Sequence, residues 1–147
     1  MVKRFFRYLF SFVLSVSLIS TCRAQSFISD KTVRKQVQRV RLSRSDIERA
    51  AAAEDLFDMA RGKDLSHVRL QTVHMISDFI DADFDGVTIW IAATLGEFGG
   101  RASFAAPRLV DHLRKVDCLR VDSSSAFTIR VALKKMGEDV PDSKCSK

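Results

Sequence analysis

Five apolar stretches with helical spacing follow one another along most of the chain, and they limit the fold more than any other feature. Apolar residues recur along them at intervals of three and four, the period of an α-helix, and no stretch alternates apolar and polar residues as a half-buried strand does. Short connections join the stretches, so the sequence predicts an all-α fold of about five helices. The predicted helices cover residues 45–61, 66–80, 87–98, 103–116 and 126–136.

Several of these helices carry clear start and stop signals. Ser45 followed by Glu48 is a capping box, in which each side chain accepts a hydrogen bond from a free backbone N–H of the first turn. Gly62 and Gly137 follow the first and last helices, and Pro107 falls in the first turn of the fourth. The apolar stripes expected to face the core include Ile47, Leu56 and Met59, then Val68, Val73, Ile76, Phe79 and Ile80, and finally Phe127, Ile129, Leu133 and Met136.

The third and fifth helices repeat one pattern. Ile91, Leu95, Phe98 and Gly99 recur as Ile129, Leu133, Met136 and Gly137 at a constant offset of 38 residues. A period near 40 residues built from two helices is typical of HEAT and armadillo arrays. One helix pair cannot bury its apolar face alone, so the pairs of such an array must stack.

Residues 85–99 (DGVTIWIAATLGEFG), followed by 105–113 (AAPRLVDHL), resemble a bacterial HEAT-like repeat unit. That unit opens its first helix with Asp and Val, ends it with Gly and starts its second helix near Ala-x-Pro-x-Leu. The resemblance covers residues 85–116 and extends to 124–140. Residues 45–80 have the right size for a further unit, but Arg61 and His74 stand where Gly and Leu are expected. The resemblance implies a short α-solenoid of two and a half helix pairs that serves as an interaction scaffold.

The first 24 residues are interpreted as a secretory signal peptide. Lys3, Arg4 and Arg7 precede an apolar core, Tyr8–Ile19, and small residues lead to a cleavage site after Ala24. The apolar core is shorter than the roughly 20 residues that a membrane-spanning helix needs. We therefore expect a periplasmic or secreted protein that does not span a membrane. An uncleaved anchor or a buried N-terminal helix is one alternative, and a lipoprotein anchored at Cys22 is another.

Cleavage would remove four bases and no acid, which lowers the net charge from +6 to +2. Residues 25–44 then hold most of the positive charge, and we interpret them as a polar, partly helical segment ahead of a domain that covers 45–147. This basic segment is expected to be solvated, with contact to an anionic envelope surface as the alternative. Nucleic acid is not an expected partner, because no aromatic residue interleaves the bases. The bases are Lys31, Arg34, Lys35, Arg39, Arg41 and Arg44.

Two cysteines, Cys118 and Cys145, remain after the expected cleavage. An even number of cysteines in an oxidising compartment favours a structural disulfide. Closing a loop of this length stabilises a protein by about 3–4 kcal/mol on the chain-entropy model. We expect this disulfide to cap the C-terminal end of the helical domain.

The segment Asp81–Gly86 matches the first half of a calcium-binding loop, with carboxylates at Asp81, Asp83 and Asp85. The bidentate Glu that should complete the loop is replaced by Ala92. The preferred interpretation is that these acids stabilise the N-terminus of the next helix through its dipole, so no cofactor is expected. Calcium binding stays open as the alternative.

The chain carries no recognisable catalytic motif, so an enzyme is not expected. The leading hypothesis is an exported module that binds another protein through one face of its helical array. Trp90 and Phe104 would be the natural anchors if they are exposed, whereas burial would make them core residues. The alternatives are an inhibitor or immunity protein directed against a cell-wall toxin, a calcium-dependent binding protein and an envelope-associated structural protein.

Overall fold

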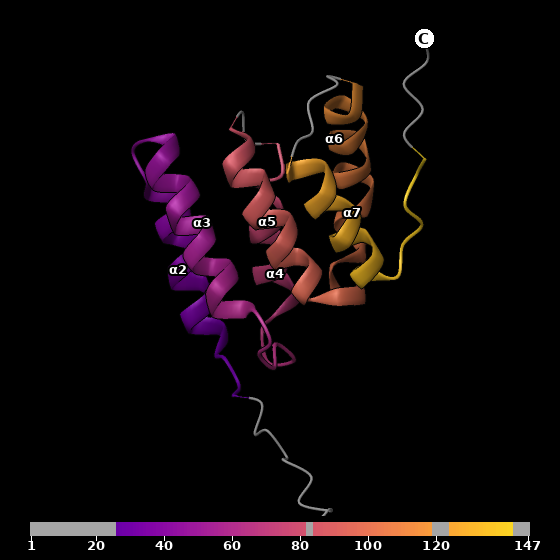
Figure 1. The fold of residues 1–147 in the computed structure, drawn as a ribbon. Helices are drawn as coiled ribbons and strands as arrows, with labels where there is room; N and C mark the ends of the chain where they lie inside the picture. The colour runs from indigo at the N-terminus through magenta and orange to yellow at the C-terminus, as the bar shows by residue number, and fades with distance from the viewer. Residues whose placement is uncertain (1–25, 82–83, 119–123, 143–147) are drawn as a thin grey trace, which may run out of the picture.

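The computed structural model describes residues 26–81, 84–118 and 124–142, which form an all-helical fold (Figure 1). Six α-helices, one more than expected, and one 3₁₀ helix lie in these ranges, and no β-strand does. The all-α prediction is confirmed. The elements are α2 (Asp30–Leu42), α3 (Asp46–Ala60), α4 (Leu70–Ser77), α5 (Asp85–Glu97), the 3₁₀ helix η1 (Gly99–Ala105), α6 (Ala106–Cys118) and α7 (Ser124–Met136).

The α-helices form two layers (Figure 1). Helices α3, α5 and α7 lie side by side in one layer, with α5 packed against both of its neighbours. Helices α2, α4 and α6 form the second layer behind them, and α2 packs on α3 as α6 packs on α7. Successive helices alternate between the layers, so the three helices of the front layer run in the same direction.

Helix α2 belongs to the packed fold, and this corrects the interpretation of residues 25–44 as a solvated lead-in. Val33, Val37 and Val40 are fully buried. The buried side chain of Gln36 donates a hydrogen bond to the backbone oxygen of Ala52 on α3, at 2.9 Å. The expected helical content is present, but the three valines at i, i+4 and i+7 mark a core-facing stripe.

The first turn of α3 forms one of the two hydrogen bonds of the predicted capping box. The Ser45 hydroxyl accepts a hydrogen bond from the N–H of Glu48 at 3.2 Å, but the Glu48 carboxylate accepts one from the N–H of Arg44, the residue before the cap, at 3.0 Å instead of from the N–H of Ser45. The expectation that Ile47 belongs to the buried apolar stripe is wrong, because this residue is 78% exposed. It lies in the first turn of α3, whereas the buried residues of this helix begin at Ala52.

Two predicted helices differ in their bounds. Residues 66–69 form a turn before α4, and the carboxylate of Asp64, just ahead of this turn, accepts a hydrogen bond from the N–H of Ser66. Helix α4 is therefore only eight residues long. The 3₁₀ helix η1 takes up residues 99–105, so α6 begins at Ala106 and Pro107 is its second residue. Proline fits there because an N–H in the first turn has no partner within the helix.

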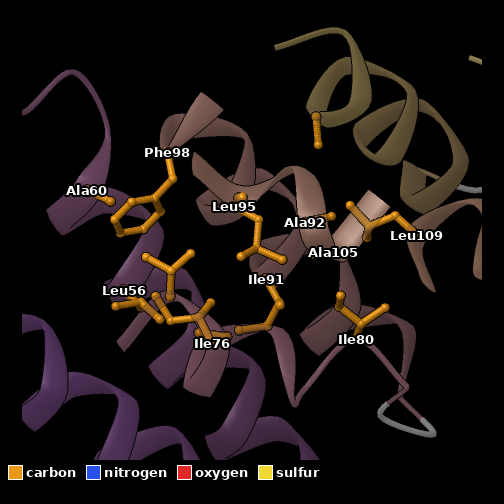
Figure 2. Close-up of a cluster of buried hydrophobic side chains, with 14 of the residues drawn as sticks. Leu56, Ala60, Ile76, Ile80, Ile91, Ala92, Leu95, Phe98, Ala105 and Leu109 are labelled. Atoms are coloured by element: carbon orange, nitrogen blue, oxygen red, sulfur yellow. The ribbon is translucent and has the colours of Figure 1, made fainter. Parts of the chain in front are cut away.

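The core is centred on α5 (Figure 2). Ile91 and Leu95 lie between Leu56 of α3 on one side and Leu109 of α6 on the other. The helix approaches α7 closely at Gly96, where an added Cβ would lie 3.1 Å from the Cα of Ala132.

The two helices related by the 38-residue offset, α5 and α7, are neighbours in the front layer. Ile91 and Leu95 are fully buried, and so are Ile129 and Leu133 at the matching positions of α7. The glycines that follow the two helices have left-handed backbones, with φ of 56° at Gly99 and 81° at Gly137. At these positions the two copies of the repeat therefore share buried residues and a left-handed glycine after the helix, although Gly99 also begins η1.

Candidate functional site: an apolar groove across α3, α5 and α7

The front layer carries an open groove of about 470 Å³ on its outer surface. Helix α5 forms the floor, α3 borders it on one side and α7 on the other. Ligand-binding pockets commonly have 300–1,000 Å³ and a mostly apolar lining with a few polar groups. The lining residues are Phe57, Ile89, Trp90, Ala93, Phe127, Thr128, Val131, Ala132 and Lys135.

The groove exists because α5 is apolar around most of its circumference. Its buried face carries Ile91 and Leu95, while Ile89, Trp90 and Ala93 are only partly buried and line the groove. No charged residue lies between Asp85 and Glu97 at the two ends of the helix. A helix that is apolar all round is normally buried on every side. Here its outer side is left open to solvent.

Helix α7 borders the groove with two apolar side chains that face outward. Phe127 is 72% exposed and Val131, one turn later, is 37% exposed. The expectation that Phe127 belongs to the buried stripe is wrong. Phe127 and Ile129 are two positions apart, which places them on nearly opposite sides of a helix. Ile129 faces the core, so Phe127 faces the groove.

Aromatic contacts border the groove on its α3 side. The ring centroids of Phe57 and Trp90 are 5.6 Å apart with an interplanar angle of 31°. The guanidinium of Arg61 lies 5.4 Å from the Phe57 ring and forms an ion pair with Asp58 at 3.2 Å. Such contacts hold Phe57 and Trp90 in fixed positions.

An ion pair closes the end of the groove next to η1. Glu97 of α5 accepts hydrogen bonds from the ammonium of Lys135 and from the N–H of Gly62, the latter at 3.1 Å. Burial by itself would raise the pKa of Glu97, but these two hydrogen bonds and the positive charges of Lys135 and Arg61 outweigh it and lower the pKa. The pair therefore ties α3, α5 and α7 together at one end.

The two residues proposed as anchors lie in different elements. Trp90 is partly buried on the floor of the groove. Phe104 belongs to η1, where its ring stacks on that of His74 in α4 with centroids 3.7 Å apart. Only Trp90 is part of the candidate site. Both rings also pack against the hydrophobic core.

The described carboxylates of the calcium-loop candidate lie next to side chains of α6. Asp81 accepts a hydrogen bond from Arg108 at 2.7 Å, and a carboxylate oxygen of Asp85 lies 3.7 Å from Nε2 of His112. Asp83 lies outside the described residues. Within the described ranges, no three His, Cys, Asp or Glu side chains are grouped so that they could hold a metal ion.

The six basic residues of the segment 31–44 divide into two groups. Arg34, Arg39 and Arg41 form ion pairs with acids at 3.4, 2.7 and 3.6 Å, respectively. The other three, Lys31, Lys35 and Arg44, are exposed and form no ion pair within the part of the chain that the structure describes. About half of the positive charge predicted to meet an anionic surface is thus neutralised by neighbouring carboxylates, which are those of Asp30, Asp55 and Asp78.

Several predicted features fall outside the described residues. They include the signal peptide, the alternative lipid anchor at Cys22, and Cys145. The backbone of Cys118 is described and ends α6. Among the described residues, no helix is both long and apolar enough to cross a membrane.

When the chain was compared with protein-family models, with curated proteins and with solved structures, none of them matched it.

Proposed function

We propose that this protein is an exported, non-enzymatic helical module that binds another protein through the groove formed by α3, α5 and α7. The exposure of Phe127 beside a partly buried Trp90 carries the proposal. Aromatic side chains at the centre of an interface supply much of its binding free energy, and a groove of this kind offers them a pocket. Large apolar groups exposed together, rather than singly, commonly mark interaction sites.

The layered arrangement supports the HEAT-like interpretation of the sequence. In such arrays each helix pair packs only on its neighbours, which leaves one long face of each layer available for binding. The neighbouring positions of α5 and α7, with their matched buried residues and matched terminal glycines, are what a repeat of about 40 residues would produce. By this analogy the module acts as a scaffold.

The proposed compartment is the periplasm or the cell exterior, reached after cleavage near Ala24, and such an oxidising compartment would allow the proposed Cys118–Cys145 disulfide to form. Residues 137–142 run back along α7 (Figure 1), and Arg130 donates a hydrogen bond to the backbone oxygen of Pro141 at 3.1 Å. The intact mass of the exported chain measures cleavage, lipidation and the proposed disulfide together.

The binding proposal is tested by affinity capture from the envelope of the host. Tagged wild-type protein is compared with Phe127→Asp, which places a charge in the groove. The control is Leu42→Asp, because Leu42 is 75% exposed on α2, away from the groove. We expect a stoichiometric partner that the wild type and Leu42→Asp retain and that Phe127→Asp loses.

The identity of that partner distinguishes the proposed roles. A cell-wall-directed enzyme whose activity falls on binding would make the module an inhibitor or immunity protein, and a partner without such activity would make it a scaffold. Equal retention by wild type, Phe127→Asp and Leu42→Asp would refute the groove as the binding surface.

A further inference from the structure

The outer side of α2 carries free bases and an apolar side chain on one stripe. Lys35 follows Lys31 by four residues and precedes Leu42 by seven, and both spacings keep residues on one side of a helix. Both lysines are exposed and form no ion pair within the described ranges. Val33 and Val37 face the core from the opposite side of the helix. Because α2 packs on α3 and α4 at one edge of the fold, its outer stripe faces solvent (Figure 1).

The turn that joins α2 to α3 exposes two large apolar side chains. Leu42 is the last residue of α2, and Ile47 is the second residue of α3. No other large hydrophobic residue in the described part of the chain is as exposed as these two. Arg44 lies between them in the sequence and is itself exposed, with no ion pair among the described residues. The turn therefore combines a free positive charge with apolar groups in water.

An open groove of about 830 Å³ lies beside this turn. Lys35 and Arg39 line it together with the apolar side chains of Leu42 and Met59, and none of the described acids lines it. Arg39 pairs with Asp55 at 2.7 Å, so Lys35 supplies the unpaired charge. Such a lining suits an anionic group that is attached to an apolar chain.

Charge is divided unevenly between α2 and the rest of the expected mature chain. Residues 25–44 hold six bases and one acid, a net charge of +5, whereas residues 45–147 hold 14 bases and 17 acids, a net charge of −3. Of the two acids that follow the turn, Asp46 pairs with Arg49 at 3.1 Å, and Glu48 accepts the hydrogen bond from the backbone of Arg44. An anionic surface would attract the α2 side and repel the remainder, which orients the molecule.

We propose that the α2 side of this protein binds an anionic lipid membrane. Lys31, Lys35 and Arg44 contact the phosphate headgroups, and Leu42 and Ile47 enter the apolar layer beneath them. Peripheral proteins gain affinity from these two contributions together. The inference goes beyond the proposed function, because α2 belongs to the layer behind the groove of α3, α5 and α7 (Figure 1). The protein can therefore hold a partner in that groove while it is bound to a membrane.

The two apolar side chains favour a bilayer over a soluble polyanion or an acidic protein. A soluble polyanion would pair with the bases but leave Leu42 and Ile47 in water. An acidic protein would need a pocket that fits a protruding turn at the edge of the fold (Figure 1). A bilayer needs no matching pocket, because its lipids rearrange around the side chains that enter it.

The test is sedimentation with lipid vesicles. It uses a chain that starts at Gln25 and keeps every described helix, because the apolar core of the signal peptide would bind vesicles by itself. Wild type is expected to bind vesicles of phosphatidylethanolamine and phosphatidylglycerol and to be released by high salt, which screens exposed charges. It should bind vesicles of phosphatidylcholine, and soluble polyglutamate, much more weakly.

The charge contribution is measured with Lys35→Gln/Arg44→Gln. Each base near an anionic surface contributes enough that losing two should weaken vesicle binding about thirty-fold. The control Lys115→Gln/Lys134→Gln removes the same charge from α6 and α7, where both lysines are exposed and form no ion pair in the described chain. This control should bind vesicles nearly as well as wild type.

The apolar contribution is measured with Leu42→Ser/Ile47→Ser, which leaves every charge in place. Losing the burial of these two side chains should weaken vesicle binding about ten-fold or more. The control is Phe127→Ser, because Phe127 is almost as exposed but lies on α7, and it should bind as wild type does. All of these positions are exposed, so each variant should keep the helical circular dichroism and the melting transition of wild type.

Three results would overturn the membrane proposal. They are equal binding to anionic and neutral vesicles, charge variants that bind like their control, and serine variants at Leu42 and Ile47 that bind like Phe127→Ser. The last result together with tight binding to polyglutamate would assign the basic stripe to a soluble polyanion or an acidic protein. Failure here is separate from failure of the proposed function. Leu42→Asp should lose the vesicles but keep the partner of the groove, and Phe127→Asp should do the reverse.

Discussion

Asp30, the first residue of α2, links three segments through one carboxylate. It accepts hydrogen bonds from the hydroxyl of Thr72 at 2.6 Å and from the N–H of Arg69 at 2.9 Å, and it pairs with Arg34 at 3.4 Å. Burial by itself would raise its pKa, but these hydrogen bonds and the charges of Arg34 and Arg69 lower it below its ordinary value. The carboxylate thus helps to hold α2 against the start of α4.

Asp30 and Glu97 predict acid sensitivity at the residue scale. Both have a lower pKa in the folded chain than in the unfolded chain, so the stability they contribute is fully present above the ordinary carboxyl pKa of about 4. It is lost as the pH falls through the folded-state values. The melting temperature of the wild type should therefore fall steeply below about pH 4.5, and that of Asp30→Asn/Glu97→Gln should fall less.

The measurement is thermal unfolding followed by circular dichroism from neutral to acidic pH. Glu138→Gln is the control, because Glu138 is exposed and its side chain forms no ion pair within the described residues. It should keep the wild-type acid sensitivity. An unchanged pH dependence in the double variant would show that these two carboxylates do not govern acid unfolding.

At the scale of elements, the close approach of α5 and α7 depends on Gly96. A Cβ at this position would lie 3.1 Å from the Cα of Ala132 and 3.3 Å from its Cβ, so the helices would have to move apart. Overpacking costs about 1–3 kcal/mol, whereas alanine gains only about 1 kcal/mol over glycine inside a helix. Gly96→Ala should therefore lower the free energy of unfolding by about 1 kcal/mol in urea denaturation.

Gly100→Ala is the matched control for this prediction. The nearest atom to its added Cβ is the backbone oxygen of Met136 at 3.8 Å, an ordinary contact. Its stability should stay within about 0.5 kcal/mol of the wild type. If Gly96→Ala were as stable as Gly100→Ala, the packing of α5 on α7 would have to be looser than the structure describes.

Helix ends and inward stripes were predictable because they depend on local chemistry. Ser45 caps α3, and Gly99 and Gly137 adopt the left-handed backbone that follows a helix. The exposure of Ile47 and Phe127 was not predicted, because apolar residues alone do not show which side of a helix its neighbours cover. The groove was not predicted for the same reason. Its floor and borders come from three helices that meet only in the folded chain.

At the scale of the whole molecule, α2 acts as an outer helix of the fold. The basic and polar residues of its exposed side dominate its composition, and the interpretation as a lead-in followed from that composition. Three buried valines among thirteen residues are enough to dock it, because further contacts with α3 and α4 support them. These are the hydrogen bond of Gln36, the hydrogen bonds that Arg34 donates to Gln71 and Thr72, and the ion pairs of Arg39 and Arg41. The charge of this segment therefore serves packing as well as solvation.

This role predicts that the domain cannot fold properly without α2. Removing residues up to 44 exposes the surface of α3 and α4 that the three valines cover, and each buried apolar side chain contributes about 1.5–3 kcal/mol. A domain is typically stable by only 5–15 kcal/mol, so a chain that starts at Ser45 should lose its cooperative melting transition.

Val37→Ala in the full chain should lower the free energy of unfolding by about 1–3 kcal/mol, because it removes two buried methyl groups and leaves a cavity. Val131→Ala makes the same change on the more exposed border of the groove and should cost less than 1 kcal/mol. If the truncated chain melted as cooperatively as the full chain, and Val37→Ala matched Val131→Ala, α2 would be a solvated appendage and the folded unit would begin at α3.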